Sequence, residues 1–445
     1  MARMMLMPEL LLEGTAFQPD RAVAVDGDRI VAVGPAGQLR DAYPQFPVIR
    51  LARQALVPGG VNGHNHSFQV LLRGFGEDDD FFGWRSRVLY PISERLSRDD
   101  IRRGAELAFA DMLRNGITTV ADFFYLNDDG IENALAVAEA ARRVGIRLVL
   151  ARTFYDWEGA PARYRETPAN ARARTLALHQ ALAGDPLVTV QVAPHSPHGA
   201  SRAMIEAAVE TAALLAAPLH VHCAEGRYER EQCLTTYRQT PVGWLKQLGA
   251  LTPRTILIHA VWVDDADLDL IAAAAAKVIH NPSSNMILGD GIAPVPAMLS
   301  RGITVGLGTD GGCTNDRASI LDEMRTAALL QKVAARDGRA LDAAAAWRMG
   351  TAGGAEALAI DAGAIAPGRL ADLVALDMDD WSLLPGPLNL RQLVYGFSLQ
   401  GIRRVYVGGE ERVRDGSLPG FDAVALRRWA RERKSGWTAP APVDG

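Results

Sequence analysis

Eight short apolar runs alternate with longer stretches rich in Ala, Leu and Arg between residues 55 and 309. This rhythm predicts repeated βα units and a parallel sheet, because parallel neighbours need a long crossover connection. Eight such units close into a barrel, so we expect an α/β fold with a (β/α)8 TIM-like barrel. The expected strands are residues 55–61, 118–123, 147–152, 187–193, 218–222, 255–259, 277–281 and 304–309, with helices at 99–115, 130–144, 202–216 and 264–276.

Both chain ends have a different sequence pattern, in which short runs of alternating apolar and polar residues are separated by glycine-containing turns. Residues 22–34 (AVAVDGDRIVAVG) predict a β-hairpin, and short strands recur between residues 372 and 414. A single hydrophobic core stops growing at roughly 250–300 residues, so a chain of this length divides. We expect a small β-sandwich from residues 1–56 and 366–430, a barrel from 57–365, and a C-terminal tail at 431–445 that is poorly ordered in its Pro-rich part after Thr438.

Composition excludes several classes of partner. The formal net charge of −5 gives no general attraction to nucleic acid or to an anionic membrane, and no uncharged apolar run reaches the roughly 18 residues of a membrane span. The first nine residues do not read as a signal peptide. The three cysteines form no CxxC pair or disulfide framework, and Cys223 is expected to be a small buried apolar residue. We therefore expect a cytoplasmic enzyme with a small-molecule substrate. The sequence leaves the oligomeric state open, with a homodimer as one possibility.

Histidines and one aspartate stand at the ends of five expected strands, where barrel enzymes carry their active sites. They are His64 and His66, His220 and His222, His259, His280, and Asp310. Side chains alternate along a strand, so His64 and His66 point to the same side, and so do His220 and His222. Three imidazoles and one carboxylate make up the ligand set of a mononuclear catalytic metal site.

These residues lie in motifs that resemble the amidohydrolase superfamily. The stretch PGGVNGHNH at 58–66 resembles its strand-one HxH signature, HCAE at 222–225 the HxxE of its deaminase branch, and GTDG at 308–311 its strand-eight aspartate motif. The resemblance runs through the whole chain, including GRLADL at 368–373. It is closest to the s-triazine hydrolases, which include atrazine chlorohydrolase and melamine deaminase, in residues 66–74, 82–91 and 151–156. A more distant likeness, to guanine and 8-oxoguanine deaminases, places Gln69 three residues after the HxH motif.

The resemblance implies a role for each motif residue. His64, His66, His222 and Asp310 would hold the metal, and Glu225, His259 and Asp310 would act in the reaction. Two-metal relatives use a strand-four lysine or a bridging glutamate, and residues 192–197 (VAPHSP) contain neither. We therefore expect one divalent ion, zinc or else iron(II), because a site of three nitrogens and one oxygen suits both.

The expected reaction is hydrolytic deamination of an amino-substituted nitrogen heterocycle or cyclic amidine. Metal-bound hydroxide would attack the carbon, and Glu225 would protonate first the ring nitrogen and then the leaving ammonia. Alternatively, Glu225 merely caps the helix that follows it.

Substrate contacts are expected from Gln69, Arg73, Trp84 and His195. Arg73 fits a surface ion pair equally well, and Trp84 fits a loop core. The roles of His198 and His280 are left open. The NPSSN segment at 281–285 is expected to serve only backbone geometry.

Three other functions compete with this one. The first is an s-triazine hydrolase that expels chloride or an alkylamine, although the presence of Glu225 favours amine release. The second is a purine or adenosine-derivative deaminase, which substrate assays would distinguish. The third is a non-catalytic barrel, which normally requires broken metal ligands.

Overall fold

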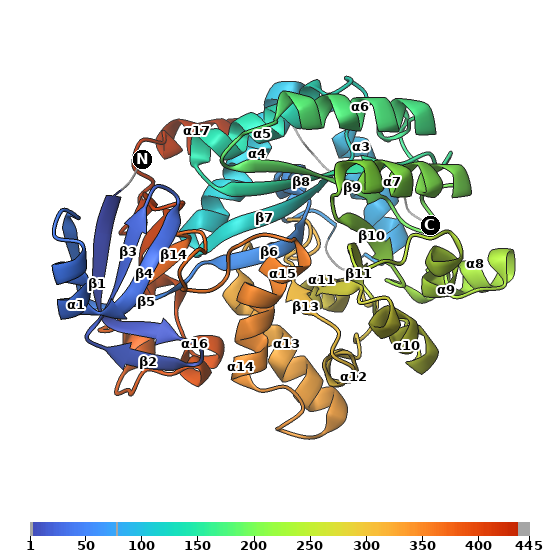
Figure 1. Cartoon of the computed structure of the whole chain (residues 1–445). Helices are drawn as coiled ribbons and strands as arrows, with labels where there is room; N and C mark the ends of the chain where they lie inside the picture. The colour runs from blue at the N-terminus through green and yellow to red at the C-terminus, as the bar shows by residue number, and fades with distance from the viewer. Residues whose placement is uncertain (1–2, 77–78, 435–445) are drawn as a thin grey trace.

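The computed structural model describes residues 3–76 and 79–434 and contains two sheets of eight strands each (Figure 1). One is a nearly closed barrel in which every neighbouring pair is parallel and the strands follow chain order. The backbone N–H of Asp310, just past the last strand, donates to the carbonyl of His64 on the first at 3.0 Å. The TIM-like barrel is therefore confirmed. Its strands are β6 Gly60–Asn65, β7 Ile117–Phe124, β8 Arg147–Phe154, β9 Val188–Pro194, β10 Leu219–Cys223, β11 Thr255–His259, β12 Lys277–His280 and β13 Val305–Leu307.

The first barrel strand differs from the prediction. Residues 55–58 belong to β5 (Val48–Pro58) of the other sheet, and β6 begins at Gly60. The chain passes between the two sheets at Gly59, where a Cβ atom would lie 2.2 Å from Oγ1 of Thr118. One apolar run therefore feeds two sheets, and the intervening glycine allows the close approach.

Helices surround the barrel (Figure 1), and the four predicted helical stretches coincide with α4, α5, α7 and α10. Two of these helices begin at capping boxes, Ser97 with Asp100 for α4 and Asp264 with Asp267 for α10. The helices are α4 Arg98–Arg114, α5 Glu132–Val144, α6 Pro168–Ala181, α7 Arg202–Leu215, α8 Arg227–Tyr237, α9 Pro241–Gln247, α10 Asp265–Ala273, α11 Pro282–Ile287, α12 Val295–Ser300, α13 Ile320–Ala335, α14 Ala343–Arg348 and α15 Gly354–Ala357. None of the described helices is long and apolar enough to cross a membrane.

Several short elements complete the connections. Between β6 and α4 the chain forms η1 Ser67–Leu72, α2 Phe81–Trp84, η2 Arg85–Leu89 and α3 Tyr90–Ser93. The others are η3 Ala162–Tyr164, η4 Met349–Gly353, η5 Trp381–Leu383, α16 Leu390–Tyr395 and η6 Leu399–Gly401.

The second sheet combines both chain ends, as expected. Its N-terminal strand β5 pairs antiparallel with β14 from the C-terminal part, and β1 and β5 are its parallel pair. The predicted hairpin is present, with Asp26 opposite Arg29 across the turn. Its elements are β1 Arg3–Glu13, β2 Ala16–Pro19, β3 Arg21–Asp26, β4 Arg29–Pro35, β5 Val48–Pro58, β14 Leu373–Asp377, β15 Ile402–Val407 and β16 Glu410–Arg414, with α1 Ala36–Ala42 beside them.

A buried ion pair ties this sheet to the barrel. The guanidinium of Arg147, the first residue of β8, donates to both carboxylate oxygens of Asp372 at 2.9 and 3.1 Å. Asp372 also accepts the backbone N–H of Gly408 at 2.7 Å. These bonds join the amino-terminal end of the barrel strands to the C-terminal strands of the second sheet.

Helix α17 (Ala423–Lys434) crosses the expected start of the tail at residue 431, so the first four residues assigned to the tail are helical. The rest of the expected tail, including its Pro-rich part, lies outside the described residues.

Candidate active site

The strand-end residues converge at the carboxyl end of the barrel. His64 lies on β6, His66 follows it directly, His222 lies on β10 and His259 ends β11. Asp310 follows β13, and all five side chains are buried. His259 and Asp310 have φ of 75° and 58°, a conformation that non-glycine residues adopt rarely and that is frequent at functional sites.

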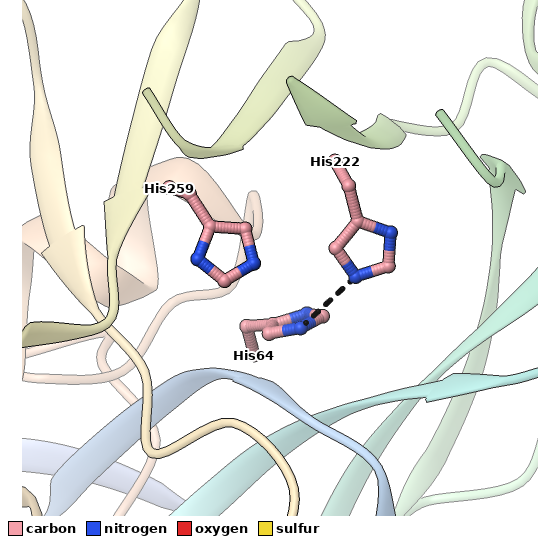
Figure 2. Close-up of side chains that lie close together, drawn as sticks. All are labelled: His64, His222 and His259. Atoms are coloured by element: carbon pink, nitrogen blue, oxygen red, sulfur yellow. Dashed lines mark hydrogen bonds between the residues drawn. The ribbon is translucent and has the colours of Figure 1, made fainter. Parts of the chain in front are cut away.

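Ring nitrogens and carboxylate oxygens approach one another closely in this cluster. Nε2 of His222 lies 3.3 Å from Nε2 of His64, and Figure 2 shows these rings with His259 around one small space. Oδ1 of Asp310 lies 3.4 Å from Nε2 of His64 and 3.5 Å from Nε2 of His66. Ligand atoms of a tetrahedral zinc ion, with Zn–N near 2.0–2.1 Å, lie about 3.3 Å apart. The spacing therefore suits a single metal ion.

The outer nitrogens of two rings establish which atoms face this space. Nδ1 of His66 lies 2.6 Å from the carbonyl of Phe123, and Nδ1 of His222 lies 2.8 Å from the carbonyl of His195. A carbonyl only accepts, so both Nδ1 atoms carry hydrogen and both Nε2 atoms present lone pairs inward. Burial lowers the pKa of His64 to about 3 and lowers the pKa values of His66 and His222. These rings are neutral, as metal ligands must be.

The pKa values of the two carboxyl groups that line the pocket shift in opposite directions. Burial raises the pKa of Glu225 well above its ordinary value, and the carboxylates of Asp290, Asp310 and Glu229 raise it further. For Asp310, burial acts upward, but Nε2 of His64 at 3.4 Å and the imidazoles of His259 and His66 bring the pKa well below its ordinary value. A carboxyl group with a raised pKa beside one with a lowered pKa is the arrangement of a proton donor and a proton acceptor.

Glu225 does not cap the helix that follows it. Helix α8 begins after Gly226, without a side-chain capping bond. The carboxylate Oε1 of Glu225 instead lies 3.5 Å from Nε2 of His259. The helix-cap interpretation is therefore wrong.

The segment after β12 does more than shape the backbone, contrary to the expectation for NPSSN. The side-chain amides of Asn281 and Asn285 lie 3.2 and 3.0 Å from Nδ1 of His259. The hydroxyl of Ser284 donates to Oδ2 of Asp310 at 2.7 Å. Three side chains of this turn thus orient two groups of the site.

Three of the expected substrate-contact residues line the pocket. Trp84 is buried there, with Nε1 3.2 Å from Sγ of Cys313. His195 stacks on Tyr155 at 4.0 Å between ring centroids. Gln69 also lines the pocket, but its amide donates to the hydroxyl of Tyr125 at 2.6 Å and accepts from Cys313 at 3.2 Å. Both ends of the Gln69 amide are therefore already bonded within the protein, and a direct contact with substrate would add to one of these bonds or replace it.

Other expected residues lie elsewhere. Arg73 is not among the described residues that line this pocket. It forms an ion pair with Asp111 on α4 at 3.1 Å, which agrees with the alternative expectation of a surface ion pair. His220 lies deeper in the barrel, with Nε2 2.6 Å from Oε1 of Gln191. His280 is also fully buried and outside the lining, whereas His198 lines the pocket.

The pocket wall contains aromatic residues beyond Trp84 that were not predicted from the sequence. They are Phe81, Tyr90, Tyr125, Tyr155 and Tyr164, and Arg85 lines the pocket with them. Tyr125 and Tyr155 each follow the end of a barrel strand directly. Functional side chains of a barrel lie at the carboxyl ends of its strands, so a search of these positions for aromatic as well as ionisable residues would have identified Tyr125 and Tyr155.

Comparison with known proteins identifies relatives over the whole chain. The model of the amidohydrolase family matches residues 55–412, and that of an imidazolonepropionase-like composite domain matches residues 22–45. A 5-methylthioadenosine/S-adenosylhomocysteine deaminase of Syntrophobacter fumaroxidans is 35% identical over 91% of this chain and 91% of its own.

Solved structures agree with this relationship. An adenosine deaminase of Xanthomonas campestris with bound zinc superposes with a TM-score of 0.91 at 30% identity, covering 98% of this chain and 99% of that one. Atrazine chlorohydrolase of Arthrobacter aurescens, also with zinc, has a TM-score of 0.89 at 25% identity, covering 97% and 100%. The resemblance to triazine hydrolases is thus confirmed, and sequence identity is greater to the two deaminases described above.

Proposed function

Since the chain belongs to the amidohydrolase family, we propose that it is a zinc enzyme that hydrolytically deaminates the adenine ring of a nucleoside substituted at its 5′ position. The broader class is plain: a metal-dependent hydrolase of carbon–nitrogen bonds other than peptide bonds. The observation that carries the proposal is the pair of overlapping groups of candidate ligands, His64 with His66 and Asp310 and His64 with His222 and His259. They lie beside Glu225, whose pKa burial raises, in a chain 35% identical to a nucleoside-derivative deaminase.

Four residues would hold the ion: His64, His66, His222 and Asp310. We leave His259 out of this set, although it lies near His64 and His222. The side-chain amide of Asn285, which also donates to Asp290 at 3.1 Å, donates to Nδ1 of His259, and this supports a ring hydrogen on Nε2. A divalent ion bound there supplies the Lewis acidity that makes water a nucleophile near neutral pH. Zinc is proposed because both solved relatives described above contain it.

Proton transfers fall to the remaining polar groups. Glu225 donates its proton to the ring nitrogen beside the amino-bearing carbon, is reprotonated by the hydroxyl group formed on that carbon, and passes this second proton to the leaving amine, after which the proton taken up by Asp310 restores it. Asp310, which is ionised, accepts the proton of the attacking water. His259 directs its Nε2–H towards Glu225 at 3.5 Å and Asp310 at 4.0 Å, and so orients both the nucleophile and the acid.

The walls of the pocket suit a flat heterocycle. Tyr125, Tyr155 and Trp84 provide aromatic faces. Nδ1 of His195 bonds Ser196, and Nε2 has no hydrogen-bond partner within residues 3–76 and 79–434, so it is free to bond a ring nitrogen. An aromatic wall serves a triazine equally well, which keeps s-triazine hydrolysis as the second candidate. Glu225 favours release of an amine over release of chloride, because ammonia needs a proton to leave.

A screen for ammonia release tests the proposal. Zinc-loaded protein is assayed with 5′-methylthioadenosine, adenosine, guanine, 8-oxoguanine and melamine, and with atrazine for chloride release. Turnover concentrated on the adenosine derivatives is expected. Turnover confined to guanine or to the triazines would overturn the nucleoside assignment and leave the hydrolase class standing.

A further inference from the structure

One cation of the pocket wall is not used by this mechanism. Arg85 opens η2, in the segment that crosses the barrel mouth, and lines the pocket together with His195 and Glu225. Its guanidinium carbon lies 4.8 Å from the ring centroid of Trp157, 5.1 Å from that of Phe82, 5.5 Å from that of Tyr90 and 5.6 Å from that of Phe81. Aromatic rings from two loops therefore hold this charge in place.

The Arg85 guanidinium has no acidic partner. Within residues 3–76 and 79–434 it makes no hydrogen bond or ion pair, and its Nε is buried without a partner. Three other described arginines have a buried, unbonded nitrogen, but each forms an ion pair: Arg73 with Asp111, Arg152 with Glu166 and Arg412 with Glu410. A half-buried cation that lines a substrate pocket, without an acceptor among the described residues, is arranged for an acceptor on the ligand.

The charge of Arg85 reaches other groups of the pocket. Burial raises the pKa values of Tyr155 and Tyr228 well above their ordinary range, and the positive charge of Arg85 offsets a small part of that rise in both. The carboxyl groups that line the pocket, Glu225 and Asp310, lie instead beside His259. The pocket thus has an acidic end for amine chemistry and a separate cationic wall.

We propose that Arg85 is a specificity residue that binds an anionic group, a carboxylate or a phosphate, on the part of the substrate remote from its amino-bearing ring. The proposal deepens the proposed function and rests on it, since the anionic group would belong to the 5′ substituent of the nucleoside. A guanidinium meets carboxylate and phosphate oxygens with the same parallel pair of N–H donors, so both groups fit its chemistry.

The test compares three substrates that share the adenosine ring. 5′-Methylthioadenosine is neutral at the 5′ side, S-adenosylhomocysteine carries a carboxylate and adenosine 5′-monophosphate carries a phosphate. The variant Arg85→Met keeps an apolar stem among the aromatic rings, and Arg85→Lys keeps the charge. Arg87→Met is the matched control, because Arg87 lies two residues away, pairs with Asp79 and is not among the lining residues.

Arg85→Met is expected to lower kcat/KM for one anionic substrate by about 10- to 100-fold while leaving the neutral substrate nearly unchanged. Arg85→Lys should restore part of this preference, and Arg87→Met should not alter it. The substrate that loses the most identifies the anion as carboxylate or phosphate.

Three results would overturn the proposal. If wild-type protein deaminates the neutral nucleoside but neither anionic one, Arg85 does not bind an anion, and the proposed function stands. Equal losses on neutral and anionic substrates would assign Arg85 a purely structural role. If none of the three nucleosides is deaminated, the proposed function itself fails, and the assignment of Arg85 fails with it.

Discussion

Replacing Glu225 with glutamine tests the core of the proposed chemistry. Among the described residues that line the pocket, Glu225 is the carboxyl group whose pKa is raised, while that of Asp310 is lowered, so no second acid is ready to take over. Glutamine keeps the shape of the side chain and an N–H donor but cannot transfer a proton. Loss of a general acid costs roughly 10²–10⁴ in rate, equivalent to about 3–5 kcal/mol in the activation barrier.

The assay measures ammonia release and bound metal on the same preparations of Glu225→Gln. Metal content should equal that of the wild type, because Glu225 is not one of the four proposed ligands. Glu231→Gln serves as the control, since Glu231 is exposed on the same helix α8 and pairs with Arg227. Wild-type turnover by Glu225→Gln would refute its role as the acid, and parallel loss of metal would show that Glu225 belongs to the metal site.

Four further outcomes are expected. Purified protein should contain about one equivalent of divalent metal by elemental analysis, and His222→Ala should lose it; two tightly held equivalents would contradict the single site. Gln69→Ala should keep its metal and lower kcat/KM by about 10- to 100-fold, because a buried hydrogen-bond partner is left unpaired; unchanged kinetics would remove Gln69 from the site. Arg147→Ala should destabilise the fold by about 3–5 kcal/mol, seen in the unfolding midpoint, because it strands the buried carboxylate of Asp372; an unaltered midpoint would refute this. Burial raises the pKa of Glu323 from 4.5 to about 7, so ionisation of Glu323 opposes folding, with no effect below pH 4.5 and the full effect above pH 7. The melting temperature of Glu323→Gln should therefore rise relative to that of the wild type between pH 5 and pH 8. A difference in melting temperature that stays constant with pH would contradict a raised pKa of Glu323.

The barrel and the candidate metal ligands could be predicted from the sequence because both depend on local periodicity. His64 and His66 share a side through the two-residue period of a strand, and parallel strands place His222 and Asp310 at the same rim. Contacts across the barrel mouth have no such local signal. The bond between Asn285 and His259 joins the segment after β12 to the end of β11, and its existence depends on the packed loops.

Arg85 shows the same limit. In the sequence it is one of many arginines, and its isolation from acids appears only when the loops after β6 and β8 come together. The first barrel strand was misplaced for a different reason, since one continuous apolar run serves both β5 and β6 and only Gly59 marks their division.

The pairing of β5 with β14 sets an order of events during synthesis. Pro58 pairs with Leu373, so the second edge of β5 waits for its partner until every barrel unit has been synthesised, although β1 already pairs with its first edge. Contacts so distant along the chain carry a large loop-closure cost and form late. The barrel, whose neighbouring strands follow chain order, can assemble from its N-terminal end meanwhile. Until β14 arrives, β5 presents one open edge, and the nascent chain is most exposed to aggregation in that interval.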